Sequence, residues 1–429
     1  MLTLLNKFKK IDFYFLGVSI FLIRLPPFYF FPIQSFLFLS HTLARLLILV
    51  LFSWIFLLLI YKKEKKQFPK IMQLLMIFWF VSQSISIVAA NNIGAFLDGY
   101  KDIVFALLIF ISTFFIVKKS NIDFFIKLLL FATLIHLLFQ FFSYFYPSLT
   151  YSIFGQIIYS PYWRIFDYQY QRNRFFGDAL DETLIPLLFY FLIRKEVKIL
   201  NKIIASSSLA LITFLTIVSN WRSKLVIYFF SLTGSLLLYK INFKKLLTFG
   251  IIGLSIILVT NFVSLYTVGQ NIIDRVIYPG KQESETITAR YNFWREATEI
   301  GFSSPIVGVG LGNYFDNLSS KSRELSKSSI VNTYESFITI DDPHNIFFSI
   351  FATTGLFGII SFILLTGYFF YTDYKIYVKN QYEVNSLIII YWSIFIFSIL
   401  NPWLYFSYLA FIWFIRGLIE SLKIDYEKK

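Results

Sequence analysis

The chain has 429 residues, of which 57% are hydrophobic and only 15% are charged, and its mean hydropathy is +0.66. A soluble protein of this length would carry far more polar surface, so the composition excludes that class and predicts an all-α polytopic integral membrane protein. The absence of cysteine excludes disulfides, thiolate catalysis and cysteine-ligated metals.

Twelve apolar runs are long enough to cross a bilayer as helices, since about 20 residues suffice. They cover residues 11–31, 36–61, 70–90, 101–117, 123–146, 180–194, 201–219, 224–239, 246–266, 346–371, 385–400 and 403–420. The basic N-terminus lacks a small-residue cleavage site, so we expect the first run to be retained as a helix. The runs predict a nine-helix membrane region over 1–266, an external loop over 267–345, and a three-helix membrane region with a cytoplasmic tail over 346–429.

The net charge of +14 would suit nucleic-acid binding, but the placement of the charges indicates membrane topology instead. One alternate set of connections, with both termini, holds 24 of the 39 Lys and Arg residues. The other set holds 14, although it includes the two longest loops, and Arg45 falls inside the second run with no assigned role. By the positive-inside rule, both termini are cytoplasmic and the loops at about 147–179 and 267–345 lie outside.

The two sides also differ in the kind of basic residue. The cytoplasmic set has 22 Lys and 2 Arg, whereas the external set has 5 Lys and 9 Arg. The external arginines are Arg24, Arg164, Arg172, Arg174, Arg222, Arg275, Arg290, Arg295 and Arg323. A guanidinium matches a phosphate through two parallel hydrogen bonds, so the group suggests a phosphate ligand. For any single arginine, an ordinary ion pair with a loop carboxylate is an equal alternative.

The long loop contains a predicted amphipathic helix over residues 286–305, TITARYNFWREATEIGFSSP. Its apolar stripe comprises Ile287, Tyr291, Trp294 and Ala297. Arg290 and Trp294 are four residues apart, so guanidinium and indole can meet. The glycine alternation of IVGVGLGNYF, which follows, is a weak match to a nucleotide loop. It predicts a tight turn that approaches the membrane surface or a ligand.

Aromatic residues alternate with arginines in the other long loop, PYWRIFDYQYQRNRFFGDALDET, residues 161–183. Rings that face sugars beside arginines that face phosphate would bind a sugar phosphate, but interfacial aromatic residues give the same pattern. Asp181 is predicted to cap the next helix. Arg222, in the short turn SNWRSK, either snorkels to the membrane surface or converges with Arg290.

One of only three histidines lies in DDPHNIFFSIFATTGLFG, residues 341–358. Asp342 and Pro343 predict a helix start, with Asp342 as the cap rather than a metal ligand. His344 then lies in the first turn, where the helix dipole disfavours the imidazolium. We expect a neutral ring whose ordinary pKa of about 6.5 suits proton abstraction. His41 and His136 lie within apolar runs and are interpreted as packing residues.

Several of these segments resemble one family in order and spacing. They are ARYNFWREA to SPIVGVGLGNY (289–314), PHN to TTGLFG (343–358), NWRSKL (220–225) and RFFG (174–177). The chain resembles the O-antigen ligase and O-antigen polymerase family of bacterial envelope glycosyltransferases. It departs from that family after RFFG, where many members carry an Asn-Pro-Asn-like turn and this sequence has DALDET.

The resemblance implies a GT-C-like fold in the bacterial inner membrane, with the active site on the outer face. It implies an inverting transfer, without metal or cofactor, of a glycan from undecaprenyl diphosphate. The acceptor is either a sugar of another lipid-linked repeat, as in a polymerase, which we favour, or a sugar of the lipid A core, as in a ligase. A chain-length regulator or a flippase would be a further partner.

The resemblance places the functional set at Arg222, Arg290 and His344, with Arg174 as a further candidate. We expect the remaining substrate contacts from Arg172, Arg164, Trp294 and Asn345. The chemistry agrees with these residue types, because a diphosphate leaves without a general acid. Arginines stabilise its growing charge, and a neutral histidine accepts the acceptor's proton. Neighbouring Asp341 and Asp342 would orient the histidine ring.

A twelve-span transporter or flippase is the main alternative from another functional class, and a non-catalytic assembly subunit is a third. Transporters often contain two similar halves. The sequence shows no internal repeat, and its external loops are unequal in length. We therefore favour the enzyme.

Overall fold

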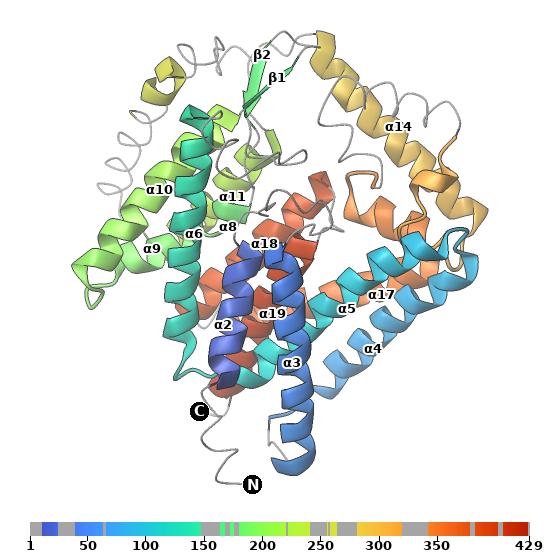
Figure 1. Ribbon diagram of the computed structural model, residues 1–429, viewed down its shortest axis with the longest axis horizontal. Coiled ribbons are helices and arrows are strands. Elements are labelled where there is room, and N and C mark those ends of the chain that lie inside the picture. The colour runs from blue at the N-terminus through green and yellow to red at the C-terminus, as the bar shows by residue number, and fades with distance from the viewer. Residues whose placement is uncertain are drawn as a thin grey trace.

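The computed structural model describes residues 11–24, 39–62, 66–146, 164–167, 172–175, 180–219, 222–240, 255, 258–263, 281–319, 342–377, 382–401 and 406–427. Within these ranges the protein is almost entirely helical (Figure 1). One short hairpin is the exception to the expected all-α fold.

The N-terminal part consists of long helices that run back and forth through the molecule (Figure 1). They are α2 (Ile11–Arg24), α3 (Leu39–Lys62), α4 (Lys70–Ile85), the 3-10 turn η2 (Ser86–Ala89), α5 (Ile93–Ile116) and α6 (Ile122–Phe145). Local signals set some of their starts. Pro69 precedes α4, and the Asn92 side chain caps α5 by accepting a hydrogen bond from the Ala95 amide (3.1 Å).

The middle of the chain contains a hairpin and a group of shorter helices. They are β1 (Arg164–Asp167), β2 (Arg172–Phe175), α8 (Leu180–Thr183), α9 (Ile185–Ile193), α10 (Ile199–Ser219) and α11 (Arg222–Leu238). The run predicted as one helix over 180–194 is divided at Leu184, and Pro186 lies in the first turn of α9. Proline lacks an amide proton and is tolerated only at a helix start, which favours two helices here.

The C-terminal part begins with α14 (Lys281–Ser303) and the 3-10 turn η3 (Phe315–Asn317). Three long helices follow: α17 (Ile346–Tyr377), α18 (Tyr382–Leu400) and α19 (Phe406–Glu427). The amphipathic helix predicted over 286–305 corresponds to α14. Its predicted apolar stripe is partly wrong, because Tyr291 is exposed, whereas Ala297 and Ile300 are buried.

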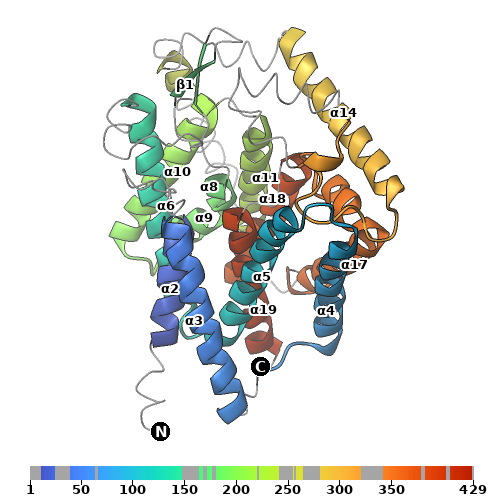
Figure 2. The same ribbon diagram turned by 45° about the vertical axis from the view of Figure 1, so that its right-hand side comes forward.

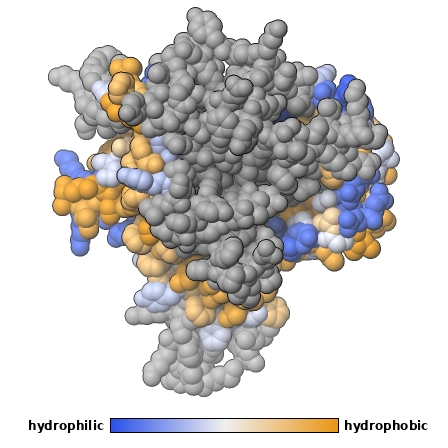
Figure 3. Space-filling view, turned by 45° about the horizontal axis from the view of Figure 1, so that its top comes forward, coloured by the Kyte–Doolittle hydropathy of each residue, from blue (hydrophilic) through white to orange (hydrophobic). Residues whose placement is uncertain are grey.

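Helix α19 packs along α5 at the centre of the molecule, and α18 packs against α19 and α11 (Figure 2). A single large apolar core joins most of the helices. In the view of Figure 3, hydrophobic side chains gather along the flanks of the described part of the molecule, beside some hydrophilic ones.

Six of the described helical segments are long and apolar enough to cross a membrane, namely α4 with η2, α5, α6, α10, α17 and α18. They are consistent with the predicted polytopic membrane protein. The run predicted over 246–266 lies mostly outside the described residues. Twelve crossings and a GT-C-like architecture therefore stay predictions.

The start of α2 and the end of α19 lie at one end of the molecule, and the hairpin and the start of α14 lie at the opposite end (Figure 1). The predicted topology, with both termini on one side of the membrane and both long loops on the other, stays a prediction. Which side is cytoplasmic is a matter of the charge distribution alone.

Helix α17 is broken at Gly355, whose backbone is left-handed (φ 64°), and the glycine loop, residues 304–312, packs into the break. Four backbone hydrogen bonds join the two, from the amides of Val309 to Ala352 (3.0 Å), Gly310 to Thr353 (2.9 Å), Leu356 to Pro305 (2.7 Å) and Phe357 to Ile306 (3.1 Å). The loop thus satisfies two carbonyls and two amides of α17 that the break frees, which a lipid environment requires. The sequence predicted a tight turn that approaches the membrane surface or a ligand, whereas the loop approaches protein backbone.

Alanine at Gly308 is expected to destabilise the protein, because φ there is +67° and a Cβ would overlap the backbone of Thr353. A left-handed alanine alone costs about 1–2 kcal/mol. The matched control is Gly367→Ala in α17, where nothing lies near the added Cβ and a gain of about 0.5–1 kcal/mol is expected. Thermal unfolding in detergent compares the two variants, and equal melting temperatures would contradict this account of the loop.

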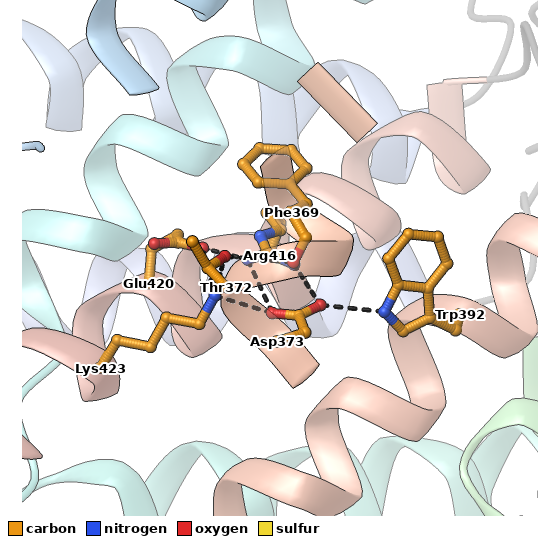
Figure 4. A network of polar contacts seen from close by, with 7 residues as sticks. All are labelled: Phe369, Thr372, Asp373, Trp392, Arg416, Glu420 and Lys423. Carbon is orange, nitrogen blue, oxygen red and sulfur yellow. Dashed lines mark hydrogen bonds and ion pairs between the residues drawn. The ribbon is translucent and has the colours of Figure 1, made fainter. Parts of the chain in front are cut away.

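A fully buried ionic network, which we call the Asp373 network, joins α17, α18 and α19 (Figure 4). Arg416 donates to both oxygens of Asp373 (2.8 and 2.9 Å) and pairs with Glu420. Lys423 contacts both acids, at 2.7 and 2.9 Å, and the Trp392 indole donates to Asp373 (2.9 Å). Two cations face two anions, so the network is neutral as a whole.

Candidate functional site

His344 lies in a tight turn directly before α17. Its backbone is left-handed (φ 57°), and its amide donates to Asp342 Oδ1 (2.8 Å). Asp342 Oδ2 accepts a hydrogen bond from Ser349 Oγ (3.0 Å), which ties the turn to the first turns of the helix. The aspartate thus fixes the backbone of His344, whereas the sequence led us to expect that it would orient the ring.

The helix cap differs from the prediction. α17 begins at Ile346, and Asn345 caps it by accepting hydrogen bonds from the amides of Phe347 (2.9 Å) and Phe348 (3.3 Å). Asp342 is therefore not the cap, because the left-handed residue that follows Pro343 interrupts the helical path. Asn345, expected to contact substrate, has its side-chain oxygen engaged in capping.

The His344 side chain is only 8% exposed, and neither ring nitrogen has a hydrogen-bond partner among the described residues. Burial, and then the positive charge of Arg290, lower the pKa of His344 to about 3. The ring is neutral, as expected, but burial dominates and the predicted ordinary pKa is wrong. Its two unpartnered nitrogens can accept a proton or position a hydroxyl.

Helix α14 brings Arg290 and Trp294 to this turn. The Trp294 ring stacks on Phe348 of α17, with centroids 5.6 Å apart and planes 14° apart. Behind it, a small apolar cluster joins α14, the glycine loop and α17 through Ala297, Ile300, Val309, Tyr314, Leu318 and Ala352. This cluster holds α14 against α17, with Arg290 close enough for its charge to lower the pKa of His344. Two of the three predicted catalytic residues therefore lie near each other.

Arg222 is the first residue of α11, and its side chain is exposed. In Figures 1 and 2, α11 stands between α10 and α14.

The hairpin lies beside α10 and carries the other predicted arginines. In the antiparallel backbone register of the two strands, Arg164 lies opposite Phe175, Arg174 opposite Ile165 and Arg172 opposite Asp167.

A second buried polar network, centred on Asp181 and Glu182 of α8, was not predicted. Asp181 pairs with Arg24 of α2 and accepts hydrogen bonds from His136 Nδ1 (2.7 Å) and Gln140 Nε2 (2.6 Å) of α6. Asp181 is thus a buried partner within α8 rather than a helix cap. His136 is not the isolated packing residue expected from its apolar neighbours.

Several basic residues with no assigned role form ion pairs. Arg45 of α3 pairs with Asp102 of α5 (2.6 Å), and Arg295 pairs with Glu299 on the surface of α14 (3.7 Å). Two of the arginines assigned to the external side, Arg24 and Arg295, therefore form ion pairs with carboxylates. The ion-pair partners are distant in sequence for Arg24 and Arg45, and no local motif indicates them.

Within the described ranges, no three His, Asp or Glu side chains gather closely enough to hold a metal ion.

Residues 205–363 match the family model described as O-antigen ligase. In this part, the chain is similar to the O-antigen ligase family. The match runs from within α10 to within α17, and it contains Arg222, Arg290 and His344. The arginines of the hairpin and the Asp373 network lie outside it in sequence. No curated protein matches the chain.

The match supports a role in the assembly of O-antigen or another surface polysaccharide at a membrane, and it implies lipid-linked glycan and an acceptor as substrates. It also confirms the resemblance based on the segments at 220–225, 289–314 and 343–358. RFFG, at 174–177, lies upstream of the matched range.

Proposed function

We propose that the protein transfers a glycan from undecaprenyl diphosphate to a sugar hydroxyl at the outer face of the inner membrane, as a polysaccharide polymerase. The observation that supports this most directly is the pairing of a buried, neutral His344 with Arg290 inside the O-antigen ligase domain. A proton acceptor beside a guanidinium is what this transfer needs.

In the proposed reaction, the acceptor hydroxyl oxygen attacks the anomeric carbon of the donor sugar from the side opposite the diphosphate. The new C–O bond forms as the bond between that carbon and the phosphate oxygen breaks, so the configuration inverts. Arg290 and Arg222 stabilise the charge that grows on the leaving diphosphate. The hydroxyl proton passes to a ring nitrogen of His344. Trp294 and the hairpin arginines bind the donor's sugars and phosphates, and neither metal nor cofactor takes part.

Donor binding also strengthens His344 as a base. In the free protein, Arg290 helps to depress the pKa of the ring. A diphosphate bound to Arg290 offsets that positive charge and favours the imidazolium, which raises the pKa. The base is therefore weak until the donor is present, and the protein has little capacity to activate an acceptor alone.

The proposal is tested with purified protein in detergent, lipid-linked repeat units and no bilayer. Wild-type protein is expected to produce polymer. Loss of a charge-assisted hydrogen bond costs about 1.5–3 kcal/mol, so Arg290→Ala should lower the rate by about 10–100-fold. Arg290→Lys should be nearly as poor, because lysine cannot form the two-pronged contact.

The matched control is Arg295→Lys, one residue past Trp294 on the exposed side of α14, which should retain activity. Full activity of Arg290→Lys would reduce Arg290 to a simple positive charge. Absence of product with the wild-type protein would reject the enzyme.

The ligase is the alternative within the same chemistry, and the description of the matched family names it. Deletion of the gene distinguishes the two acceptors. Loss of a polymerase leaves single repeats on the lipid A core, whereas loss of a ligase leaves the core without any repeats.

A transporter or flippase is supported by one structural feature. Both the α8–α9 pair and α17 are broken helices, and broken helices within the membrane are common at transporter substrate sites. A transporter would give no polymer in detergent but would move lipid-linked glycan across a reconstituted bilayer, so the same preparation decides between the two.

The proposed topology has its own test. Because the chain has no cysteine, a single introduced thiol reports its side of the membrane without background. Cysteine at Ser319, just after η3, should react with an impermeant thiol reagent added outside intact cells. Cysteine at Gln67, which is exposed just before α4, should react only after permeabilisation. The reverse pattern would overturn the assignment of the active site to the outer face.

A further inference from the structure

The start of α11 is held by its second and third residues. Ser223 Oγ donates a hydrogen bond to Asn401, directly after α18 (3.2 Å). Lys224 is fully buried, and its Nζ lies 3.0 Å from Glu182 Oε1 of α8. Arg222, the first residue of the helix, is exposed. The two charged side chains at this helix start therefore have opposite environments.

Glu182 links three helices. It is 1% exposed, and its Oε1 contacts Lys224 of α11 and accepts a hydrogen bond from Thr216 Oγ1 of α10 (2.7 Å). Its other oxygen, Oε2, is buried without a hydrogen-bond partner among the described residues. A buried carboxylate with one unpaired oxygen is a poor source of stability. Its contribution must lie in the geometry it imposes.

That geometry concerns the rotation of α11. Successive residues of an α-helix are about 100° apart around the axis, so Arg222 and Lys224 point about 200° apart. A contact that holds Lys224 inward, against α8, consequently holds Arg222 on the opposite side of the helix. An apolar residue at 224 would bury equally well but would tolerate a range of rotations.

We propose that Glu182 is a positioning residue that fixes the rotation of α11 through Lys224 and so directs Arg222 toward the donor diphosphate. The role of Arg222 in this statement rests on the proposed function. Glu182 lies upstream of the residues that match the O-antigen ligase model, whereas Lys224 and Thr216 lie within them. It also belongs to the DALDET stretch in which the chain departs from the family pattern.

The first test removes both charges together. In Glu182→Gln/Lys224→Met the glutamine can still accept the Thr216 hydrogen bond, and no buried charge is left without a partner. The variant should fold with a melting temperature close to that of the wild type. Its kcat/KM for the lipid-linked donor should fall about tenfold or more, because a misplacement of about 1 Å is enough for such a loss.

The matched control is Ser231→Ala. Ser231 is buried further along α11 and bonds to Ser393 of α18 (2.9 Å), so its loss removes a polar contact of the same helix at a distance from Arg222. This variant should keep the wild-type kcat/KM. Wild-type kcat/KM in Glu182→Gln/Lys224→Met would show that the pair has no positioning role and would overturn the proposal.

A second measurement does not depend on glycan transfer. A spin label at Arg222→Cys, in a chain with no other cysteine, reports the mobility of the helix start. Mobility should increase when Glu182→Gln/Lys224→Met is added and should stay unchanged with Ser231→Ala. Equal mobility in all three backgrounds would overturn the proposal.

If the double variant does not fold, Lys224→Met alone provides the same comparison, because the buried Glu182 can become neutral by protonation. Should wild-type protein produce no polymer, the proposed function fails, while the label still decides whether Glu182 fixes α11.

Discussion

His344→Gln is expected to lower glycan transfer by about 10²–10⁴-fold, the range typical of a lost general base. Glutamine can form a hydrogen bond with the acceptor hydroxyl but cannot take its proton. The turn should persist, because the contact that fixes it uses the backbone amide of His344 and the side chain of Asp342. Donor binding should therefore remain near the wild-type level, since the arginines are unchanged.

Purified variant and wild type should be compared for both donor binding and turnover. His41→Gln provides the same substitution at a histidine within an apolar run, and should retain turnover. Near-normal turnover of His344→Gln would show that the histidine is structural. A loss of donor binding in parallel with turnover would point to a binding role instead of proton transfer.

The low pKa of His344 has a consequence for stability. Its ordinary value in an unfolded chain is about 6.5, and its folded value is about 3. Between these values the unfolded state binds the proton and the folded state does not, so protonation favours unfolding. The contribution of this histidine to the free energy of unfolding is fully present above about pH 6.5, and it is lost as the pH falls toward 3. His344→Gln should flatten the pH dependence of the melting temperature in that window.

The sequence predicted the helices well where long apolar runs determine them. Runs of this length are stable as helices in lipid regardless of their neighbours, and α4, α5, α6, α10, α17 and α18 follow from that rule. The position of His344 was also predictable, because one histidine stands out at the boundary between a polar loop and an apolar run. The choice of Arg290 came from the family resemblance, since its spacing to Trp294 predicted only that the two side chains can meet.

The breaks in helices and the buried ion pairs were not predictable, because they depend on tertiary contacts. Gly355 breaks α17 where the glycine loop, about 45 residues earlier in the chain, supplies replacement hydrogen bonds. Asp181 and Glu182 read as ordinary residues at the start of a helix. Their partners come from α2, α6, α10 and α11, and no local pattern brings those helices together.

Arg416→Met is expected to reduce the free energy of unfolding by about 3–5 kcal/mol, the usual cost of removing one member of a buried ionic group. Arg416 is fully buried, lies over the Phe369 ring (3.9 Å) and bonds to Asp373 and Glu420. Methionine can fill much of the space, so the loss reflects mainly charge. Only Lys423 would remain to face two buried carboxylates.

Two comparisons separate charge from packing in the Asp373 network. Arg295→Met removes the arginine of an exposed pair, at 3.7 Å from Glu299, and should cost at most about 1 kcal/mol. Replacement of all four charged residues of the network by apolar ones should restore most of the stability, since no buried charge is then left unpaired. Reversible unfolding in mixed micelles measures all three variants. If Arg416→Met were as stable as Arg295→Met, the ionic contacts would contribute little to holding α17 against α19, and apolar packing alone would join the C-terminal helices.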